Sequence, residues 1–379
     1  MTLSRTLRIE YFRDQLVVWR TVGALDLSEG NFWSWAMLLN VIVCLTPFLL
    51  TMMLFSFEDP VDNILNLSMT ITSMSAIVKF SLYVANLTKL SEIQWLIGRL
   101  DEKISGEYEV KRHQAMAKHL QRISKIFLVT YGMLFTNAAF SFLLEEERSL
   151  PLPMWIPFDW KNSTAGYAAA LFLQQIGIFI QVLQSYAGDS FPPLALYLLS
   201  EQCQLLILRF SKVGYGSKTL KENEEDLVNC IRNQNTLYSL MEAIHGLISY
   251  PMFVQLFVIG INVAVACFGL VFYVVSFSDR AYFLCFLMAL ILQSFPLCYY
   301  GTVLEESFAE LHYAVFCSNW VDQSMKYKKL MLIISERTKR KQLLLAGNLV
   351  PIHLSTFVAC WKGAYTFFTL MADRDGRRA

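Results

Sequence analysis

The sequence is poor in charged residues, and the two signs nearly cancel. Asp, Glu, Lys and Arg make up 17% of the 379 residues, and 32 Lys and Arg against 31 Asp and Glu leave a formal net charge of +1. A nucleic-acid-binding protein would show a strongly basic face, so this class is excluded. Glycine (17 residues) and proline (10 residues) are also sparse, which excludes collagen-like and low-complexity disordered chains.

Catalytic and metal-binding motifs are missing as well. The five histidines are scattered, and His113 and His119 have neither the spacing nor the acidic neighbour of a zinc-binding helix. Gly214 and Gly216 lack the Lys-Ser/Thr pair of a phosphate-binding loop, so we interpret them as a turn. We therefore expect no enzymatic activity, no metal and no cofactor.

Apolar side chains are abundant. They make up 55% of the residues, and the mean hydropathy of +0.41 exceeds that of ordinary soluble domains. A helix that crosses a hydrocarbon core about 30 Å thick needs roughly 20 apolar residues. Six stretches of the sequence clearly meet this requirement: 32–57, 126–144, 165–188, 247–278, 281–304 and 342–371. A seventh candidate span, 64–88, is rich in Ser and Thr and contains Lys79.

The distribution of positive charge decides the orientation. With seven spans, the loops on one side contain 23 Lys and Arg, and those on the other side contain 6. Such an excess marks the cytoplasmic side, so we predict a cytoplasmic N-terminus and an extracellular C-terminus. Without a span at 64–88, loops rich in Lys and Arg would fall on both sides of the membrane. We therefore count 64–88 as a span. No cysteine falls in an outside loop, so no disulfide is expected.

The predicted cytoplasmic loops are long and contain amphipathic helical patterns at 90–100, 222–245 and 303–335. A further one, 194–210, continues the fourth span after a break at Pro192-Pro193. These helices should pack together as a cytoplasmic anchor bundle. The fold class is thus an all-α membrane protein of seven transmembrane helices plus this bundle. The segments are a cytoplasmic N-terminal segment (1–31), helices one to six with their extensions (32–304), anchor helices (305–345), a seventh helix (346–372) and an extracellular tail (373–379).

Two lysines fall inside predicted spans, where an ionisable group is costly unless it faces protein or water. We expect Lys79 to point into the bundle toward a polar partner, with snorkelling toward the cytoplasm as the alternative. Lys362 either lines a water-filled path or snorkels to the outer interface. In the outside loop 145–164, Asn162 begins an Asn-Ser-Thr sequon and is a candidate glycosylation site.

The C-terminal third contains a set of residues in a specific order and spacing. They are Trp320, Lys328-Lys329-Leu330, Ile334, Arg337, Leu345-Ala346-Gly347, Pro351, Leu354, Phe357, Lys362, Tyr365 and Thr369-Leu370. In this order and spacing the chain resembles insect odorant receptors. Asp189 at the inner end of span four agrees with the same family, and Thr366 stands where that family often has Ser.

The resemblance implies a tuning subunit of a tetrameric, ligand-gated, non-selective cation channel in the plasma membrane of a sensory-neuron dendrite. The implied partners are a small volatile odorant, membrane lipid and the shared co-receptor Orco, whose extended insertion between spans four and five this chain lacks. A gustatory-type receptor channel of the same superfamily and a metabotropic seven-helix receptor remain the alternatives. The stretch 364–372 departs from the gustatory pattern, and the predicted orientation contradicts a metabotropic receptor. A secondary transporter would show inverted repeats, and we favour this class less than either of the two alternative receptor types.

Candidate site residues follow from this architecture. Four copies of one helix around an axis can form a pore, and the candidates for pore and gate are Lys362, Tyr365, Thr369 and Asp373. The resemblance assigns the subunit anchor to Trp320, Lys328, Leu330 and Ile334. An apolar pocket in the outer halves of spans two, three, four and six would suit a small, flat volatile, with Ser73, Asn137 or Tyr282 supplying a hydrogen bond. Its candidates, each of which has ordinary packing as the alternative, are Met69, Ser73, Phe135, Asn137, Phe140, Phe172, Ile176, Phe179, Tyr282 and Phe286.

Overall fold

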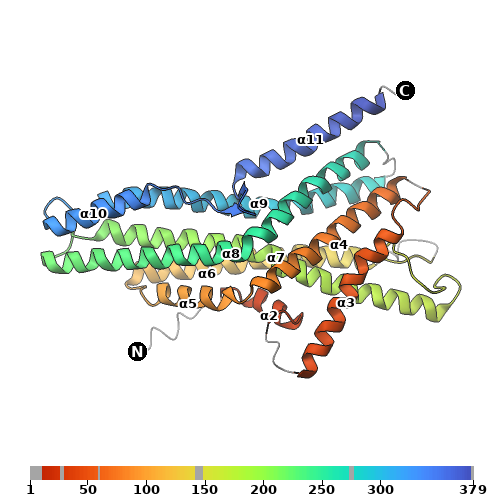
Figure 1. Ribbon diagram of the computed structural model, residues 1–379, viewed down its shortest axis with the longest axis horizontal. Helices are drawn as coiled ribbons and strands as arrows, with labels where there is room; N and C mark the ends of the chain where they lie inside the picture. The colour runs from red at the N-terminus through yellow and green to blue at the C-terminus, as the bar shows by residue number, and fades with distance from the viewer. Residues whose placement is uncertain (1–10, 26–29, 59, 141–147, 273–276, 377–379) are drawn as a thin grey trace.

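The computed structural model describes residues 11–25, 30–58, 60–140, 148–272 and 277–376, and these are almost entirely helical (Figure 1). Short helices α2 (Arg13–Thr21), α5 (Lys89–Asp101) and α10 (Met325–Thr338) and the 3-10 turn η2 (Val315–Cys317) accompany seven long helices. The long helices are α3 (Gly30–Met52), α4 (Pro60–Asn86), α6 (Glu107–Phe140), α7 (Thr164–Lys212), α8 (Leu220–Phe272), α9 (Phe277–Ala314) and α11 (Leu354–Gly376).

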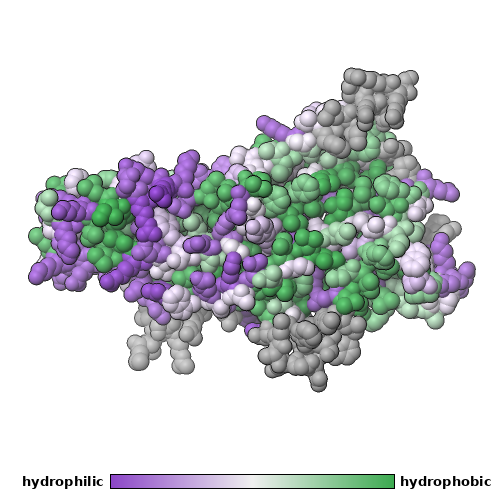
Figure 2. All heavy atoms as spheres, in the orientation of Figure 1, coloured by the Kyte–Doolittle hydropathy of each residue, from purple (hydrophilic) through white to green (hydrophobic). Residues whose placement is uncertain are grey.

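Length and composition identify the helices that cross the membrane. Among the described residues, α4, α6, α7, α8 and α9 are each long and apolar enough to do so, and α3 contains the shorter apolar segment Asn40–Met52. Together with α11, these helices correspond to the seven predicted spans, including 64–88. Apolar residues cover the half of the molecule that contains α4 and the C-terminal part of α8, whereas hydrophilic residues cover the end that contains α10 (Figure 2). The prediction of an all-α, seven-span membrane protein is confirmed.

Four helices continue from the apolar half into the hydrophilic half. α6, α7, α8 and α9 contain 34, 49, 53 and 38 residues, which corresponds to roughly 51 to 80 Å. The expected break at Pro192-Pro193 is wrong, because α7 passes through both prolines as one helix. The amphipathic patterns at 194–210 and 222–245 are therefore parts of α7 and α8 and not separate helices. The pattern at 303–335 includes the end of α9, η2 and the start of α10.

The largest hydrophobic cluster extends through both halves of the molecule. α7 lies at its centre, and Phe191, Leu194 and Leu198 of this helix are fully buried. α7 packs against α2, α3, α4, α6, α8 and α9. A smaller cluster in the apolar half joins α8, α9 and α11 through Ile259, Val263, Ala264, Leu290 and Ala364. This second cluster fixes the inner face of α11.

The last helix begins at Leu354, later than the predicted residue 346. The preceding residues form a hairpin of β1 (Leu345–Ala346) and β2 (Val350–Pro351), with Gly347 and Asn348 at positive φ angles of 58°. The Gly347 N–H donates a 2.9 Å hydrogen bond to the Ser249 carbonyl of α8. A Cβ atom at Gly347 would lie 2.8 Å from the Phe253 ring, so only glycine fits this turn.

Candidate functional site

A buried polar network joins five helices inside the apolar half. Lys79 of α4 and Asp189 of α7 are 6% and 4% exposed, and their Nζ and Oδ1 atoms lie 2.8 Å apart. Lys79 also donates to Gln255 of α8, and the Tyr131 hydroxyl of α6 donates to the second carboxylate oxygen of Asp189. Gln293 of α9 donates to the Tyr131 hydroxyl at 2.8 Å and accepts from Gln255 at 3.1 Å. The prediction that Lys79 points to a polar partner within the bundle is confirmed.

This network satisfies the hydrogen-bonding groups that burial takes from water. Removing two charges from water costs several kcal/mol per ion unless close pairing and further hydrogen bonds compensate. Here the Asp189 carboxylate accepts from both Lys79 and Tyr131, and Lys79 donates to two acceptors. The sequence analysis identified Lys79 and Asp189 separately and missed Tyr131, Gln255 and Gln293. The only signal for the two glutamines was their polarity within apolar spans.

Helices α7, α8 and α9 each contain a proline about one turn from the residue that they contribute to the network. The chain reverses direction between α7 and α8 and again between α8 and α9. Consequently the network residue lies on the same side of the proline in all three helices, toward the apolar half. The pairs are Asp189 with Pro192, Gln255 with Pro251, and Gln293 with Pro296.

The N-terminal helix α2 docks beside this network. The Gln15 side-chain amide is buried and donates to the Ser190 hydroxyl at 2.8 Å, one residue after Asp189. The Trp19 ring is fully buried, with ring centroids 5.6 Å from Tyr83 and 5.3 Å from Phe191. The sequence analysis treated 1–31 as one cytoplasmic segment and missed this helix.

Part of the predicted ligand set lies at two separate contacts of α7, one with α6 and one with α4. Phe135 of α6 and Phe179 of α7 meet edge to face with ring centroids 5.6 Å apart, and Phe179 is 47% exposed. The buried Ser73 hydroxyl accepts a 2.9 Å hydrogen bond from Gln181, a residue that the prediction missed. Met69 and Ile176 are half-buried on the same helices, α4 and α7.

The remaining predicted ligand residues do not join this group. Phe286 is half-buried and packs against the clusters of α8 and α9. Asn137 is exposed, and Phe140 and Phe172 are 55% and 66% exposed on the outside of the bundle. The Tyr282 side chain lies outside the described part of the molecule.

α11 has two chemically different faces. Thr356 and Ala364 are buried, and Trp361 packs against α8 and α9. Tyr365 is 66% exposed at the border between the faces, and the Asp373 side chain lies outside the described part of α11. The exposed face carries, at helical spacing, Ser355, Ala359, Lys362, Thr366 and Thr369. Of these, the sequence analysis had named Lys362 and Thr369 as pore candidates.

The predicted anchor residues mainly contact their own chain. Ile334 of α10 is buried, and Leu330 and Trp320 are half-buried against the largest cluster. Lys328 is also half-buried. The outward face of α10 instead carries Met325, Leu332 and Ile333, which are 70%, 62% and 66% exposed. The sequence analysis missed these outward residues.

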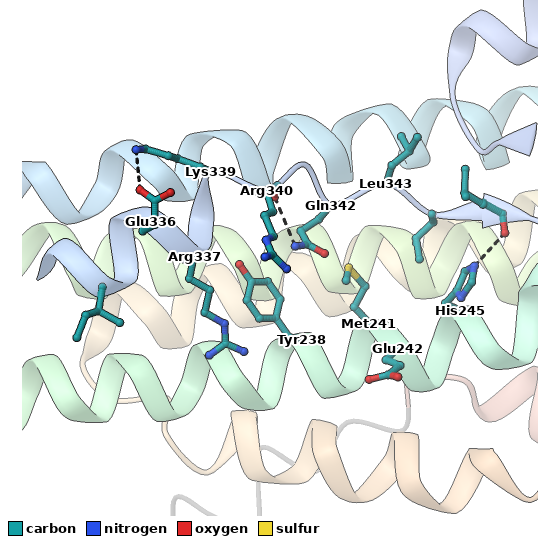
Figure 3. Close-up of a pocket in the computed structure, with 13 residues that line it drawn as sticks. Tyr238, Met241, Glu242, His245, Glu336, Arg337, Lys339, Arg340, Gln342 and Leu343 are labelled. Carbon is teal, nitrogen blue, oxygen red and sulfur yellow. Dashed lines mark hydrogen bonds and ion pairs between the residues drawn. The ribbon is translucent and has the colours of Figure 1, made fainter. Parts of the chain in front are cut away.

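A cleft of about 850 Å³ opens at the hydrophilic end between α8 and α10 (Figure 3). Tyr238 and His245 belong to its α8 wall, and Arg337 of α10 lies 5.1 Å above the centroid of the Tyr238 ring. His245 donates from Nε2 to the Leu345 carbonyl at 2.9 Å. These contacts connect α8 to both α10 and the hairpin that precedes α11.

Asn162 lies exposed immediately before α7. Its side-chain amide and its backbone N–H each donate a 3.1 Å hydrogen bond to the Asp159 carboxylate. The backbone hydrogen bond and, to a smaller extent, the side-chain hydrogen bond lower the pKa of the Asp159 carboxyl. Ser163 caps α7 by accepting from the Gly166 N–H at 3.2 Å.

Comparison with known proteins identifies the family. The family model described as 7tm Odorant receptor matches residues 59–365. The chain belongs to the insect odorant receptor family. This odorant receptor is 62% identical to Odorant receptor 23a of Drosophila melanogaster over 99% of both chains. It is 33% identical to Odorant receptor 59a of the same species, covering 96% of this chain and 97% of that one.

The receptor also has the fold of a solved structure. The olfactory receptor OR5 from Machilis hrabei, in complex with eugenol, matches with a TM-score of 0.82 and 16% identity over 98% of this chain and 99% of that one. The resemblance drawn from the C-terminal third is confirmed. This odorant receptor is accordingly a multi-pass membrane protein of a sensory receptor family and not an enzyme.

Proposed function

We propose that this odorant receptor is the tuning subunit of a ligand-gated, non-selective cation channel. A volatile binds in the apolar half of the bundle, and α11 lines a central pore in a heterotetramer with the co-receptor Orco. The N-terminus is cytoplasmic, the C-terminus is extracellular, and the channel lies in the plasma membrane of a sensory-neuron dendrite.

The observation that carries this proposal is the uncovered polar face of α11. A membrane helix that exposes Lys362, Thr366 and Thr369 to lipid would be costly, because charged and hydroxyl groups lose their hydration there. The opposite face is already occupied by α8 and α9. Four such helices around one axis would turn their polar faces to a shared aqueous path.

The ligand site rests on the residues between α4, α6 and α7. OR5, which shares the fold, is in complex with eugenol, a small aromatic volatile. The contacting rings of Phe135 and Phe179 provide an apolar aromatic surface where α7 meets α6, and Ser73 with Gln181 provides a donor and an acceptor where α7 meets α4. This combination suits a small aromatic ligand with one polar group.

Assembly rests on α10. The exposed side chains of Met325, Leu332 and Ile333 form an apolar face at the hydrophilic end, where lipid cannot cover it. An apolar face of this kind indicates a protein interface. We assign it to the neighbouring subunits of the tetramer.

Whole-cell recording tests the proposal directly. Cells that express this chain with the co-receptor should show a rapid cation current during perfusion with volatile aromatics, and cells that express this chain alone should not. Tags on both termini and the glycosylation state of Asn162 report the orientation in the same cells. If surface-expressed receptor gave no current with the co-receptor over a broad panel of aromatics, esters and alcohols, the channel proposal would be rejected.

A further inference from the structure

We propose that the polar network built on the Lys79–Asp189 ion pair couples the ligand-contacting helices to α11 by holding α7, α8 and α9 together beside their prolines. The inference rests on the proposed function, because it concerns how a ligand bound between α4, α6 and α7 would change the pore. It assigns Lys79 and Asp189 as positioning residues for gating.

The prolines make α7, α8 and α9 deformable at a similar depth in the bundle, beside the polar network. A proline inside a helix donates no hydrogen bond to the carbonyl four residues earlier, and its ring crowds that turn. Pro192 of α7, Pro251 of α8 and Pro296 of α9 each create such a point. In Figure 1, α8 visibly changes direction part-way along its length. Each of these helices can therefore bend where it passes between the two halves of the molecule.

The polar network restrains this bending. Its residues on α7, α8 and α9 lie about one turn from the prolines, and Lys79 and Tyr131 connect them to α4 and α6. A buried ion pair depends strictly on distance and has no water to replace a lost partner. Rotation of α4 or α7 would separate the two charged groups, and rotation of α6, α8 or α9 would break a hydrogen bond of the network. The network therefore favours discrete arrangements of these helices over a continuous range.

The network connects the helices of the proposed ligand site to the helices that hold α11. Ser73, Phe135 and Phe179 occupy α4, α6 and α7 one to three turns from Lys79, Tyr131 and Asp189, respectively. On α8 and α9, Ile259 and Leu290 lie one turn from Gln255 and Gln293. Ile259 and Leu290 belong to the cluster that holds Ala364 of α11. A ligand that moves α4, α6 or α7 thus acts on α11 through the network.

Double substitution distinguishes an ion pair that only stabilises the fold from one that also couples ligand binding to gating. Removing one partner of a buried pair leaves an uncompensated charge, whereas replacing both with apolar side chains is often tolerated. K79M alone should therefore lower the amount of receptor at the cell surface, and K79M/D189M should restore it. If the pair only stabilises the fold, gating in the restored double variant should be normal.

The experiment measures gating in K79M/D189M co-expressed with the co-receptor, normalised to surface receptor. We expect the agonist concentration for half-maximal current, or the ratio of ligand-independent to maximal current, to change by at least about fivefold. The matched control is R112M/E201M, which removes an α6–α7 ion pair of 2.9 Å on the other side of the prolines. Its gating should equal that of wild type. Wild-type gating in K79M/D189M at normal surface level would overturn the inference.

A second readout is independent of current. Cys298 of α9 is fully buried two residues after Pro296, so its reaction rate with a membrane-permeant maleimide reports on the packing around that proline. In purified receptor, K79M/D189M should label Cys298 at least about fivefold faster than wild type and the control. Unchanged labelling would overturn the restraining role. If wild type gave no odorant-gated current, the proposed function would fail, and the labelling rate would still decide whether the pair restrains the helices.

Discussion

The Tyr83 hydroxyl donates a 2.7 Å hydrogen bond to the carbonyl of Gly188. This carbonyl lies four residues before Pro192, which has no N–H to donate to it. A Cβ atom at residue 188 would lie 3.1 Å from the Tyr83 ring, so the glycine permits the approach. A side chain of α4 thus replaces the helical hydrogen bond that the proline removes from α7, and α7 remains continuous.

Y83F should destabilise the receptor by about 1 to 3 kcal/mol, because the Gly188 carbonyl would be buried without a donor. Thermal unfolding of purified receptor measures the loss. The matched background is P192A, in which residue 192 regains an N–H that can donate to the same carbonyl. Y83F should cost less in P192A than in wild type, and an equal loss in both backgrounds would contradict this account.

F135A and F179A should each weaken the response to aromatic agonists by about tenfold or more, because each removes half of an aromatic contact surface of the proposed ligand site. Concentration-response curves with the co-receptor measure the effect. F172A is the matched control, since it removes the same ring from α7 two turns away from the Phe135–Phe179 contact. Equal shifts in all three variants would place the ligand elsewhere.

Cysteine substitutions should map the aqueous face of α11. A charged thiol reagent should change the current of receptors with cysteine at Ser355, Ala359 or Thr366, because these residues share the exposed polar face. Cysteine at the buried positions Thr356 and Ala364 should not react. Reaction of the native cysteines is measured first in the unsubstituted receptor. Modification without helical periodicity would argue against a pore lined by this face.

L332D/I333D should reduce co-purification with the co-receptor by at least about tenfold, because the two aspartates replace exposed apolar groups at the proposed interface. The fold of the single chain should persist, since neither side chain packs in its own core. L220D changes another half-exposed leucine at the beginning of α8 and serves as the control. Unchanged association in L332D/I333D would place the interface elsewhere.

Hydropathy and charge were sufficient to predict the number and type of the membrane-spanning helices. Apolar length and Lys and Arg counts distinguished seven spans, even though 64–88 is rich in polar residues. The same reasoning predicted that Lys79 requires a buried partner, because an unpaired charge inside a membrane bundle is too costly. Asp189 was named only for its place at the inner end of span four.

The partners of these charges could not be predicted from the sequence. Whether Gln255 or a neighbouring residue meets Lys79 depends on the rotation of α8 about its axis, and hydropathy does not determine that rotation. The continuity of α7 was mispredicted for a related reason. Pro192 and Pro193 indicate a break locally, whereas the hydrogen bond from Tyr83 comes from 105 residues away. Likewise, the pattern at 303–335 separated neither α10 from the end of α9 nor the inward face of α10 from its outward face.

The uninterrupted passage of α6, α7, α8 and α9 has a practical consequence for dissecting the protein. The hydrophilic end cannot be produced as a free-standing soluble fragment with its native structure. A cut at the membrane surface would sever four helices within the cluster that contains both Tyr83 and Leu237. It would also create new helix ends with unsatisfied backbone groups. Biophysical work on the hydrophilic end therefore requires the intact chain in detergent or lipid.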